Sequence, residues 1–240
     1  MNVSPPSTDK QLILRVAIPG PLRRLFDYLA TNNSTEITPK VGARVMVPFG
    51  QRTLMGVIAE ISDQSNWPKD QLKPVLQVLD AEPLFSVKMR ELFSWASSYY
   101  QYPLGLLFDS ALPKWLRKQN DLNSLSKAKP KQQKELEKKI AENFALNKMQ
   151  QLAIDSVKNS FGNFQTFLLD GVTGSGKTEV YMQLIAIAIE KNLQSIILIP
   201  EINLTPQTLA HFQQRFSVPI VVLHSQISEK ARAVAWMQAK

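Results

Sequence analysis

The stretch FLLDGVTGSGKTEVY, residues 167–181, joins an apolar run to a loop with three glycines and then to a helical pattern. The loop fits the pattern GxxxxGK followed by Ser or Thr, at the point where a strand would end and a helix would begin. Glycines let backbone N–H groups converge on phosphate oxygens, and the helix N-terminus adds its dipole. The residues of this loop are Gly171, Val172, Thr173, Gly174, Ser175, Gly176, Lys177 and Thr178.

Two side chains of the loop complete the predicted site. Lys177 would contact the β- and γ-phosphates of a nucleotide as a mobile point charge. The Thr178 hydroxyl would bind Mg²⁺, which prefers hard oxygen ligands. The alternative is a glycine-rich turn that fits the pattern by chance, but the strand-to-helix setting favours phosphate binding.

Strands and helices alternate on both sides of the loop. Helices are expected at 147–160, at 177–190 and from Pro206, with strands at 164–170, 194–200 and 219–224. Strands that alternate with helices of this length pair in parallel through right-handed crossovers. This half of the chain is therefore predicted to be α/β.

Hydrolysis would require more than the loop, because an acidic residue at the end of another strand must hold Mg²⁺ and orient water. Glu201 ends an apolar run downstream, but it follows a proline and is a poor substitute. Arg215 and Arg232 are the only arginines after the loop, and both are expected on the solvated faces of helices. The sequence thus predicts phosphate binding without the residues needed for hydrolysis.

The N-terminal half shows another pattern. Short apolar and β-branched runs at 12–18, 41–49, 54–61 and 74–80 are separated by turn signals, which indicates strands of a small β domain. A helix is expected at about 85–100.

Basic charge gathers between these two halves. Residues 111–160 carry 11 basic and 5 acidic side chains, which is six of the eight excess positive charges of the chain. One interpretation is a solvated linker followed by a charged helix at 131–144. The other is a path for a nucleic-acid backbone, since clustered lysines bind phosphates without reading sequence.

The composition excludes several classes of protein. The 240 residues include no cysteine and only two histidines, so disulfides and thiolate zinc sites are excluded and a catalytic metal site is not expected. No apolar run approaches the roughly 20 residues of a membrane span, and the N-terminus does not resemble a signal peptide. We expect a cytoplasmic protein with no membrane partner.

Several motifs occur in the order found in the PriA family of primosomal replication restart helicases, which the chain resembles. In the second half these are LNKMQ at 146–150, GVTGSGKTEVY at 171–181, IPEINLTPQ at 199–207 and LHS at 223–225. In the first half they are PLRRLFDYL at 21–29, VGARVMVPFG at 41–50, QLKPVLQVLD at 71–80 and SYYQYPLGLLFDSALP at 98–113. The resemblance covers about 1–115 and 146–240.

The resemblance implies a pocket for the 3′ end of a DNA strand. The positions that match the family pocket are Phe26, Asp27, Tyr28, Gly50 and Lys73. A carboxylate can accept a hydrogen bond from a free 3′-hydroxyl and would repel a phosphate there. Aromatic neighbours can stack on the terminal base, and a lysine can hold a backbone phosphate. The alternative is a surface turn whose Phe and Tyr enter the core.

For the second half, the resemblance implies contacts of Gln150 with the adenine edge of ATP and of loop 171–178 with ATP phosphates and Mg²⁺. It places Thr205 and Gln207 against single-stranded DNA, where their side chains suit contacts with phosphates. Thr205 before Pro206 is also a natural helix start, and both roles are compatible. Met149 stands where the family usually has an acidic residue, which weakens the assignment of Gln150.

These observations predict a multidomain chain, with a small, mainly β N-terminal DNA-binding domain and a partial α/β P-loop (RecA-like) lobe. We expect the domain that binds 3′ DNA ends at 1–113, a basic linker or helix at 114–145 in place of the family's winged helix, and the lobe at 146–240. The family's DEAH-type carboxylates, second lobe and cysteine clusters have no counterpart here. Zinc is therefore expected only in the cysteine-containing C-terminal region of family members, which has no counterpart in this sequence.

The expected function is binding of DNA forks and of 3′-hydroxyl ends, with weak ATP binding and no unwinding. The parent family would unwind DNA with 3′ to 5′ polarity in replication restart, and other primosome proteins and single-stranded DNA-binding protein are candidate partners. Two alternatives remain. A small P-loop enzyme would turn over ATP, whereas a module without enzymatic function would bind DNA or proteins regardless of Lys177.

Overall fold

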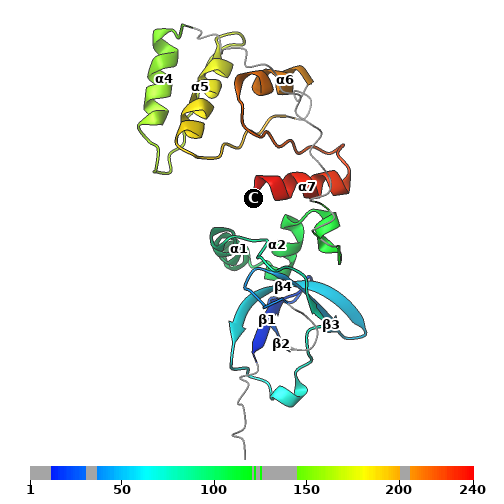
Figure 1. Cartoon of the computed structure of the whole chain (residues 1–240). Coiled ribbons are helices and arrows are strands. Elements are labelled where there is room, and N and C mark those ends of the chain that lie inside the picture. The colour runs from blue at the N-terminus through cyan, green and yellow to red at the C-terminus, as the bar shows by residue number, and fades with distance from the viewer. Residues whose placement is uncertain (1–11, 31–36, 121, 123–124, 126–144, 201–205) are drawn as a thin grey trace, which may run out of the picture. The chain divides into compact units, whose positions relative to one another are not determined.

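The computed structural model describes residues 12–30, 37–120, 122, 125, 145–200 and 206–240. The chain divides into two compact units, whose elements are labelled in Figure 1. The first unit consists of 1–129 together with 225–240, and the second unit consists of 130–224.

An antiparallel sheet of five strands forms the centre of the first unit (Figure 1). The strands are β1 (Ile13–Ala17), β2 (Phe26–Leu29), β3 (Arg44–Phe49), β4 (Arg52–Ser62) and β5 (Gln77–Val78), in the spatial order β2-β1-β4-β3-β5. The four runs expected as strands all contribute, although the last is reduced to two residues. Pro74 has no N–H to donate to a neighbouring strand, and it forms an isolated bridge with Leu29. The strand therefore does not extend back to residue 74.

β2 was not expected from the apolar pattern. Its four residues, FDYL, pair with β1 in a register that sets Asp27 opposite Arg15 and Tyr28 opposite Leu14. On its other side, the Leu29 N–H donates to the Lys73 carbonyl at 3.0 Å. β2 is thus held from both sides, which fixes the position of the residues around Asp27.

The two faces of the sheet bury two apolar clusters, because successive side chains of a strand point to opposite faces. Along β4, Ile58 belongs to one cluster and Val57 to the other. The first cluster includes Tyr28 and Val45. The second cluster is covered by helices and includes Phe85 and Phe108.

Helices cover the second cluster. They are α1 (Val87–Tyr99), α2 (Leu104–Ala111), the 3₁₀ turn η2 (Lys114–Arg117) and α7 (Glu229–Ala239), while a further 3₁₀ turn, η1 (Lys69–Gln71), lies beside the pocket described below. α1 confirms the helix expected at 85–100, whereas α2 was not expected. Gly105 allows α2 to approach β1, because a Cβ there would lie 1.9 Å from the Ile18 carbonyl oxygen.

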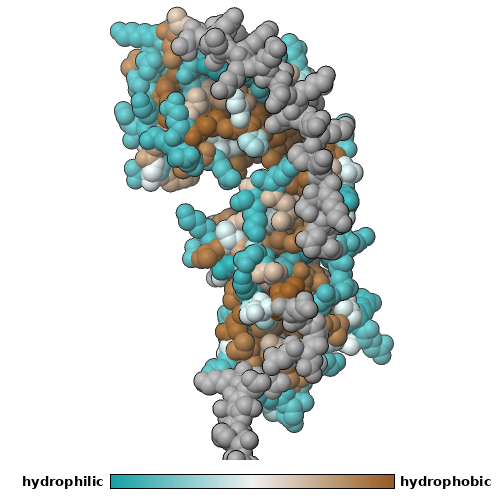
Figure 2. Space-filling view, viewed as in Figure 1, coloured by the Kyte–Doolittle hydropathy of each residue, from teal (hydrophilic) through white to brown (hydrophobic). Residues whose placement is uncertain are grey.

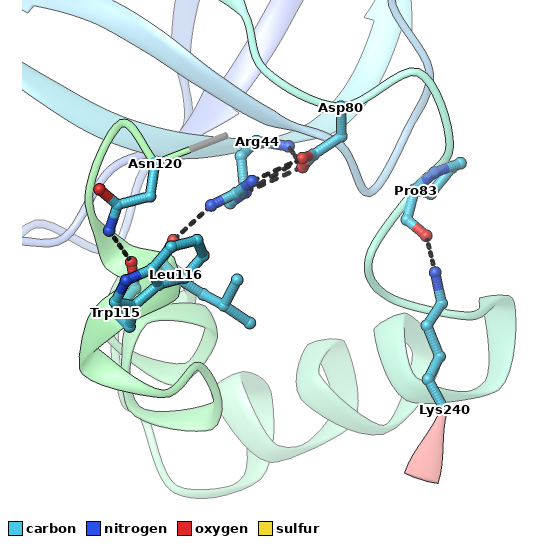
Figure 3. Close-up of polar contacts among 7 residues, drawn as sticks. All are labelled: Arg44, Asp80, Pro83, Trp115, Leu116, Asn120 and Lys240. Carbon is cyan, nitrogen blue, oxygen red and sulfur yellow. Dashed lines mark hydrogen bonds and ion pairs between the residues drawn. The ribbon is translucent and has the colours of Figure 1, made fainter. Parts of the chain in front are cut away.

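α7 completes the first unit. Ala233 is buried in the second cluster, and Trp236 packs edge-on against Phe85 with ring centroids 6.0 Å apart. The Lys240 ammonium donates to the Pro83 carbonyl at 2.5 Å (Figure 3). Part of the segment expected to belong to the α/β lobe thus packs in the first unit.

A buried ion pair joins the sheet to η2 (Figure 3). The Arg44 guanidinium contacts both oxygens of Asp80, with Nη2 to Oδ1 at 2.7 Å, and neither side chain has measurable exposure. Arg44 Nη1 also donates to the Leu116 carbonyl at 2.6 Å. Charge buried in this way is stable only because each polar atom finds a partner.

The second unit contains α4 (Lys148–Lys158), α5 (Lys177–Glu190) and α6 (Pro206–Arg215), as expected. The strands expected at 164–170, 194–200 and 219–224 do not form, and this part of the α/β prediction is corrected. A parallel sheet needs cover on both faces. Here many apolar side chains of these segments are exposed, with Phe164 at 99% and Leu168 at 92%, and apolar surface is visible on this unit in Figure 2.

Among the described residues, no helix is both long and apolar enough to cross a membrane. The same residues contain no cluster of three or more His, Cys, Asp or Glu side chains that could hold a metal ion.

Candidate functional site

A pocket of about 370 Å³ opens beside β2 in the first unit. Its walls come from β2, from the turn between β3 and β4, and from the segment at 67–73. All five residues expected at a DNA 3′ end lie in this lining, namely Phe26, Asp27, Tyr28, Gly50 and Lys73. The structure therefore brings together residues from three separate stretches of sequence.

Phe26 and Tyr28 lie on the same face of β2, but they are buried to different extents. Tyr28 is buried in the core, and its hydroxyl donates to the Pro48 carbonyl at 3.0 Å. Burial raises the pKa of Tyr28 to about 12. Phe26 is only half-buried and meets Phe49 edge-on, with ring centroids 5.2 Å apart. Tyr28 thus anchors the strand, and Phe26 offers an aromatic surface to the pocket.

Asp27 is the only acidic side chain among the described residues that line this pocket. The Ser65 hydroxyl donates to its Oδ2 at 2.5 Å, and Arg15 Nε lies 3.8 Å from its Oδ1. Arg15 is bound more closely by Glu60, at 2.8 Å, and this hydrogen bond raises the pKa of the Arg15 guanidinium. A carboxylate accepts about four hydrogen bonds, so Asp27 retains capacity to accept one from a ligand.

The path of the backbone places Lys73 and Gly50 at the pocket. The segment around Lys73 runs beside β2, held by the bond from Leu29 N–H to the Lys73 carbonyl, and its side chain is exposed. Gly50 adopts a positive φ of 60° in the tight turn between β3 and β4. This conformation favours glycine, and no other atom lies within 4 Å of the place where its Cβ would be.

Trp67 and Arg24 are among the lining residues that the sequence analysis missed. Trp67 is 58% exposed, and its backbone N–H donates to the Ser65 hydroxyl at 3.0 Å. Arg24 places its guanidinium carbon 4.9 Å from the centre of the Phe26 ring. An exposed Trp before a proline, and two successive arginines before FDY, are the signals that could have indicated them.

The loop at 171–178 lies in the second unit, immediately before α5. Gly174 and Gly176 have positive φ angles of 84° and 83°, and Gly176 is the N-cap of α5. The Lys177 ammonium bends back and donates to the carbonyls of Gly171 and of Val172, the latter at 3.0 Å. Thr178 is exposed in the first turn of α5. The loop therefore turns directly into α5, although the strand expected before it does not form.

Gln150 lies beside this loop. It closes a capping box with Asn147 at the start of α4, and its Nε2 donates to the Gly176 carbonyl at 3.3 Å. Glu179 of α5 pairs with Arg215 of α6 at 3.0 Å, so Arg215 is not the solvated residue that was expected. Gln207 is exposed in the first turn of α6. Thr205, Glu201 and the Lys-rich segment at 126–144 lie outside the described residues.

Two family models match the chain. Residues 15–113 match the model described as the 3′DNA-binding domain (3′BD) of PriA, and residues 143–234 match the model described as the res subunit of type III restriction enzymes. The first match contains the pocket beside β2, and the second contains the loop at 171–178.

Curated relatives agree with the first family model. Replication restart protein PriA of Haemophilus influenzae is 34% identical over 95% of this chain and 40% of its own length. That of Treponema pallidum is 32% identical over 93% of this chain and 33% of its own length. The chain thus spans about two fifths or less of the length of these relatives.

The fold and these matches define a protein with a small antiparallel 3′-DNA-binding domain, followed by a helicase-like region. The chain belongs to the PriA family of replication restart proteins, and it matches the N-terminal portion of that family.

Proposed function

We propose that this chain binds the 3′-hydroxyl end of a DNA strand, with the terminal nucleotide in the pocket beside β2. The observation that carries the proposal is the convergence of Phe26, Asp27 and Lys73 on one pocket. Its volume of about 370 Å³ lies within the range of about 300–1,000 Å³ typical of small-ligand sites. The match to a 3′-DNA-binding domain supports the same ligand.

Each group in the pocket has a distinct task. The Asp27 carboxylate accepts a hydrogen bond from the 3′-hydroxyl and repels a phosphate at the same place. Phe26 and Trp67 stack on the terminal base without preference for its identity. Lys73 and Arg24 neutralise backbone phosphates, so affinity falls as the salt concentration rises.

Fluorescence anisotropy with labelled single strands tests the proposal. Strands that end in a 3′-hydroxyl should bind about tenfold or more tightly than strands that end in a 3′-phosphate, because like charges placed together cost several kcal/mol. Asp27→Ala should remove this preference. Asp63→Ala, which removes an exposed carboxylate just beyond β4, is the matched control and should retain the preference. Equal binding of both ends by the wild-type chain would contradict the proposal.

Lys73→Ala should act differently from Asp27→Ala. It should weaken binding of both kinds of end alike and reduce the slope of log affinity against log salt by about 0.7 for a single strand. Lys69→Ala, in η1 and outside the pocket lining, is the control for the loss of one charge.

We also infer that the loop at 171–178 binds Mg²⁺-ATP. This inference is supported by the left-handed glycines, by the start of α5 at Lys177 and by the position of the Gln150 amide beside Gly176. The Lys177 ammonium would exchange its loop carbonyls for phosphate oxygens, and the Thr178 hydroxyl would bind Mg²⁺. A fluorescent ATP analogue should bind the wild-type chain more tightly than Lys177→Ala, with Lys158→Ala as the control on exposed α4 surface.

The helicase-like match and the PriA relatives support a proposal for a full-length protein of this family. We expect a protein of their full length to unwind DNA with 3′ to 5′ polarity during replication restart, together with other primosome proteins and single-stranded DNA-binding protein. We expect this chain to bind DNA ends without unwinding. ATP turnover by the chain would favour a small P-loop enzyme, and unchanged nucleotide binding in Lys177→Ala would favour an interaction module.

A further inference from the structure

A second groove lies next to the candidate 3′-end pocket. It has a volume of about 630 Å³ and is formed by the loop at 18–22 and the turn of the β3–β4 hairpin. Phe26, Phe49 and Gly50 line both the groove and the pocket. The two phenyl rings meet edge-on at 5.2 Å and an interplanar angle of 85°, so they form an aromatic wall between two neighbouring spaces.

The groove differs chemically from the pocket. Its lining is mostly apolar and includes Pro19, Leu22 and Leu54. Arg52 is the only charged residue among the described residues that line it, and Gln51 supplies an amide. The groove therefore offers apolar faces, a cation and a small number of hydrogen-bonding groups, without a carboxylate that would repel DNA.

We propose that this groove binds the nucleobase of the second nucleotide from the 3′ end. The inference rests on the proposed function, because the terminal nucleotide must occupy the pocket for its neighbour to reach the groove. A base has two apolar faces and polar edges, which match the faces of Leu22 and Phe49 and the amide of Gln51. Arg52 and Arg24 would lie on either side of the aromatic wall, where the phosphate between the two nucleotides must pass.

This arrangement has a specific consequence for DNA structure. Successive bases of a strand normally stack about 3.4 Å apart, whereas here an aromatic wall stands between the two bases. Binding must therefore unstack the last two bases. Unstacking costs a few kcal/mol in a duplex, and it costs less in a single strand or at a mismatch. The site should prefer 3′ ends whose last two nucleotides are unpaired over fully paired ends.

The test uses the full chain and strands that carry a 3′-hydroxyl and a single abasic position. Loss of the second base should weaken wild-type binding about fivefold or more, which is the lower end of the effect of one base stacked on an aromatic ring. Loss of the fourth base should have little effect. An equal loss at the second and fourth positions, or no loss at the second, would overturn the inference.

A double-mutant cycle assigns the effect to the groove. Leu22 is 48% exposed, so Leu22→Ala should leave the fold intact, which the thermal transition of the variant checks. This variant should bind unmodified DNA more weakly, but it should lose little further affinity when the second base is absent. A second variant, Gly20→Leu, adds a side chain at a residue that lines the groove and should obstruct it. The fold should tolerate this change, because a Cβ at Gly20 meets no other atom within 4 Å. If Leu22→Ala and the abasic second position each reduce affinity by amounts that add in the combined experiment, the inference is contradicted.

The outcomes separate this inference from the proposed function. If 3′-hydroxyl and 3′-phosphate ends bind equally, the pocket assignment fails. If the preference for the 3′-hydroxyl persists and the second base has no effect, only the groove assignment fails. In partial duplexes, an abasic site can instead be placed in the complementary strand. If affinity falls only in that case, the groove binds the complementary strand and the inference is overturned.

Discussion

The Ser65 hydroxyl donates a hydrogen bond of 2.5 Å to Oδ2 of Asp27, across 38 positions of sequence. The same hydroxyl accepts a hydrogen bond from the Trp67 backbone N–H at 3.0 Å. Ser65 therefore links the carboxylate that would read the DNA end to the backbone of Trp67, whose indole would stack on the terminal base. It orients the Asp27 carboxylate directly and fixes the backbone that carries the indole.

Ser65→Ala should reduce the preference of the chain for 3′-hydroxyl over 3′-phosphate ends by roughly three- to tenfold. Without the hydroxyl, the Asp27 carboxylate loses a charge-assisted hydrogen bond and its fixed orientation, and such bonds contribute about 1.5–3 kcal/mol. Anisotropy with both kinds of end measures the effect. Ser62→Ala is the matched control, because within the described part of the chain the Ser62 hydroxyl bonds only to the backbone of Gln64. An equal change in both variants would show that the loop, and not the bond to Asp27, is responsible.

Trp67→Ala should weaken binding of a 3′-hydroxyl strand by about 1–3 kcal/mol, the typical contribution of one base stacked on an aromatic side chain. Trp67→Phe should retain part of the affinity. An abasic terminal nucleotide should bind the wild type and Trp67→Ala with similar affinity. Trp95→Phe is the control, because Trp95 stacks on Tyr99 in α1 and does not line the pocket. DNA should quench the fluorescence of this control variant, and absence of quenching would argue against stacking on Trp67.

The elements that could be predicted from the sequence are those with a regular apolar pattern. β1, β3, β4, α1, α4 and α5 follow runs whose period matches the element. β2 could not be predicted in this way, because its four residues include Asp27 and depend on pairing with β1 and with the segment at 73–75. The strands expected in the second unit show the opposite failure, since an apolar run provides a strand only where neighbours cover it.

The candidate site was predicted by resemblance more than by pattern. Phe26, Asp27 and Lys73 carry no periodic signal, and the family motif was needed to group them. Ser65 could not be predicted from the sequence, since its hydrogen bond to Asp27 depends on a loop that folds back onto β2. The contact of Lys240 with Pro83 spans 157 positions, so no local signal could place α7 in the first unit.

Asp80→Ala should destabilise the first unit by about 3–5 kcal/mol, because it leaves the Arg44 guanidinium buried and without its carboxylate partner. Chemical denaturation monitored by tryptophan fluorescence measures the change. Asp109→Ala is the matched control, because Asp109 pairs with Arg117 at 3.1 Å in a partly exposed position. Its loss should cost about 1 kcal/mol or less. Similar losses in the two variants would show that burial does not set the contribution of these pairs.

Gly105→Ala should also destabilise the first unit, by several kcal/mol, because the added methyl group would lie 1.9 Å from the Ile18 carbonyl oxygen. To relieve this contact, α2 would have to move away from β1 and open the cluster around Phe108. Gly162→Ala, in the second unit, is not a suitable control because of its positive φ of 93°. Gly20→Ala is suitable, since its φ is not positive and a Cβ there meets no other atom within 4 Å. A melting temperature for Gly105→Ala equal to that of Gly20→Ala would contradict the close approach.

Tyr28 should make stability depend on pH in alkaline solution. Its pKa is about 12 in the folded chain and 10.0 ordinarily, so the folded state favours the neutral phenol that donates to the Pro48 carbonyl. The unfolded chain releases this proton first as pH rises. The contribution of Tyr28 is therefore fully present below pH 10 and is lost progressively between about pH 10 and 12.

The measurement compares the free energy of unfolding of wild type and Tyr28→Phe from pH 8 to 12. Other tyrosines and lysines titrate in both proteins, so the difference between the two curves isolates Tyr28. At pH 8 the variant should be less stable by about 0.5–1.5 kcal/mol, the typical contribution of one hydrogen bond. Above pH 10 the wild type should lose stability faster than the variant, and the difference should shrink or reverse. A constant difference across the whole range would show that the Tyr28 phenol titrates alike in the folded and unfolded chain.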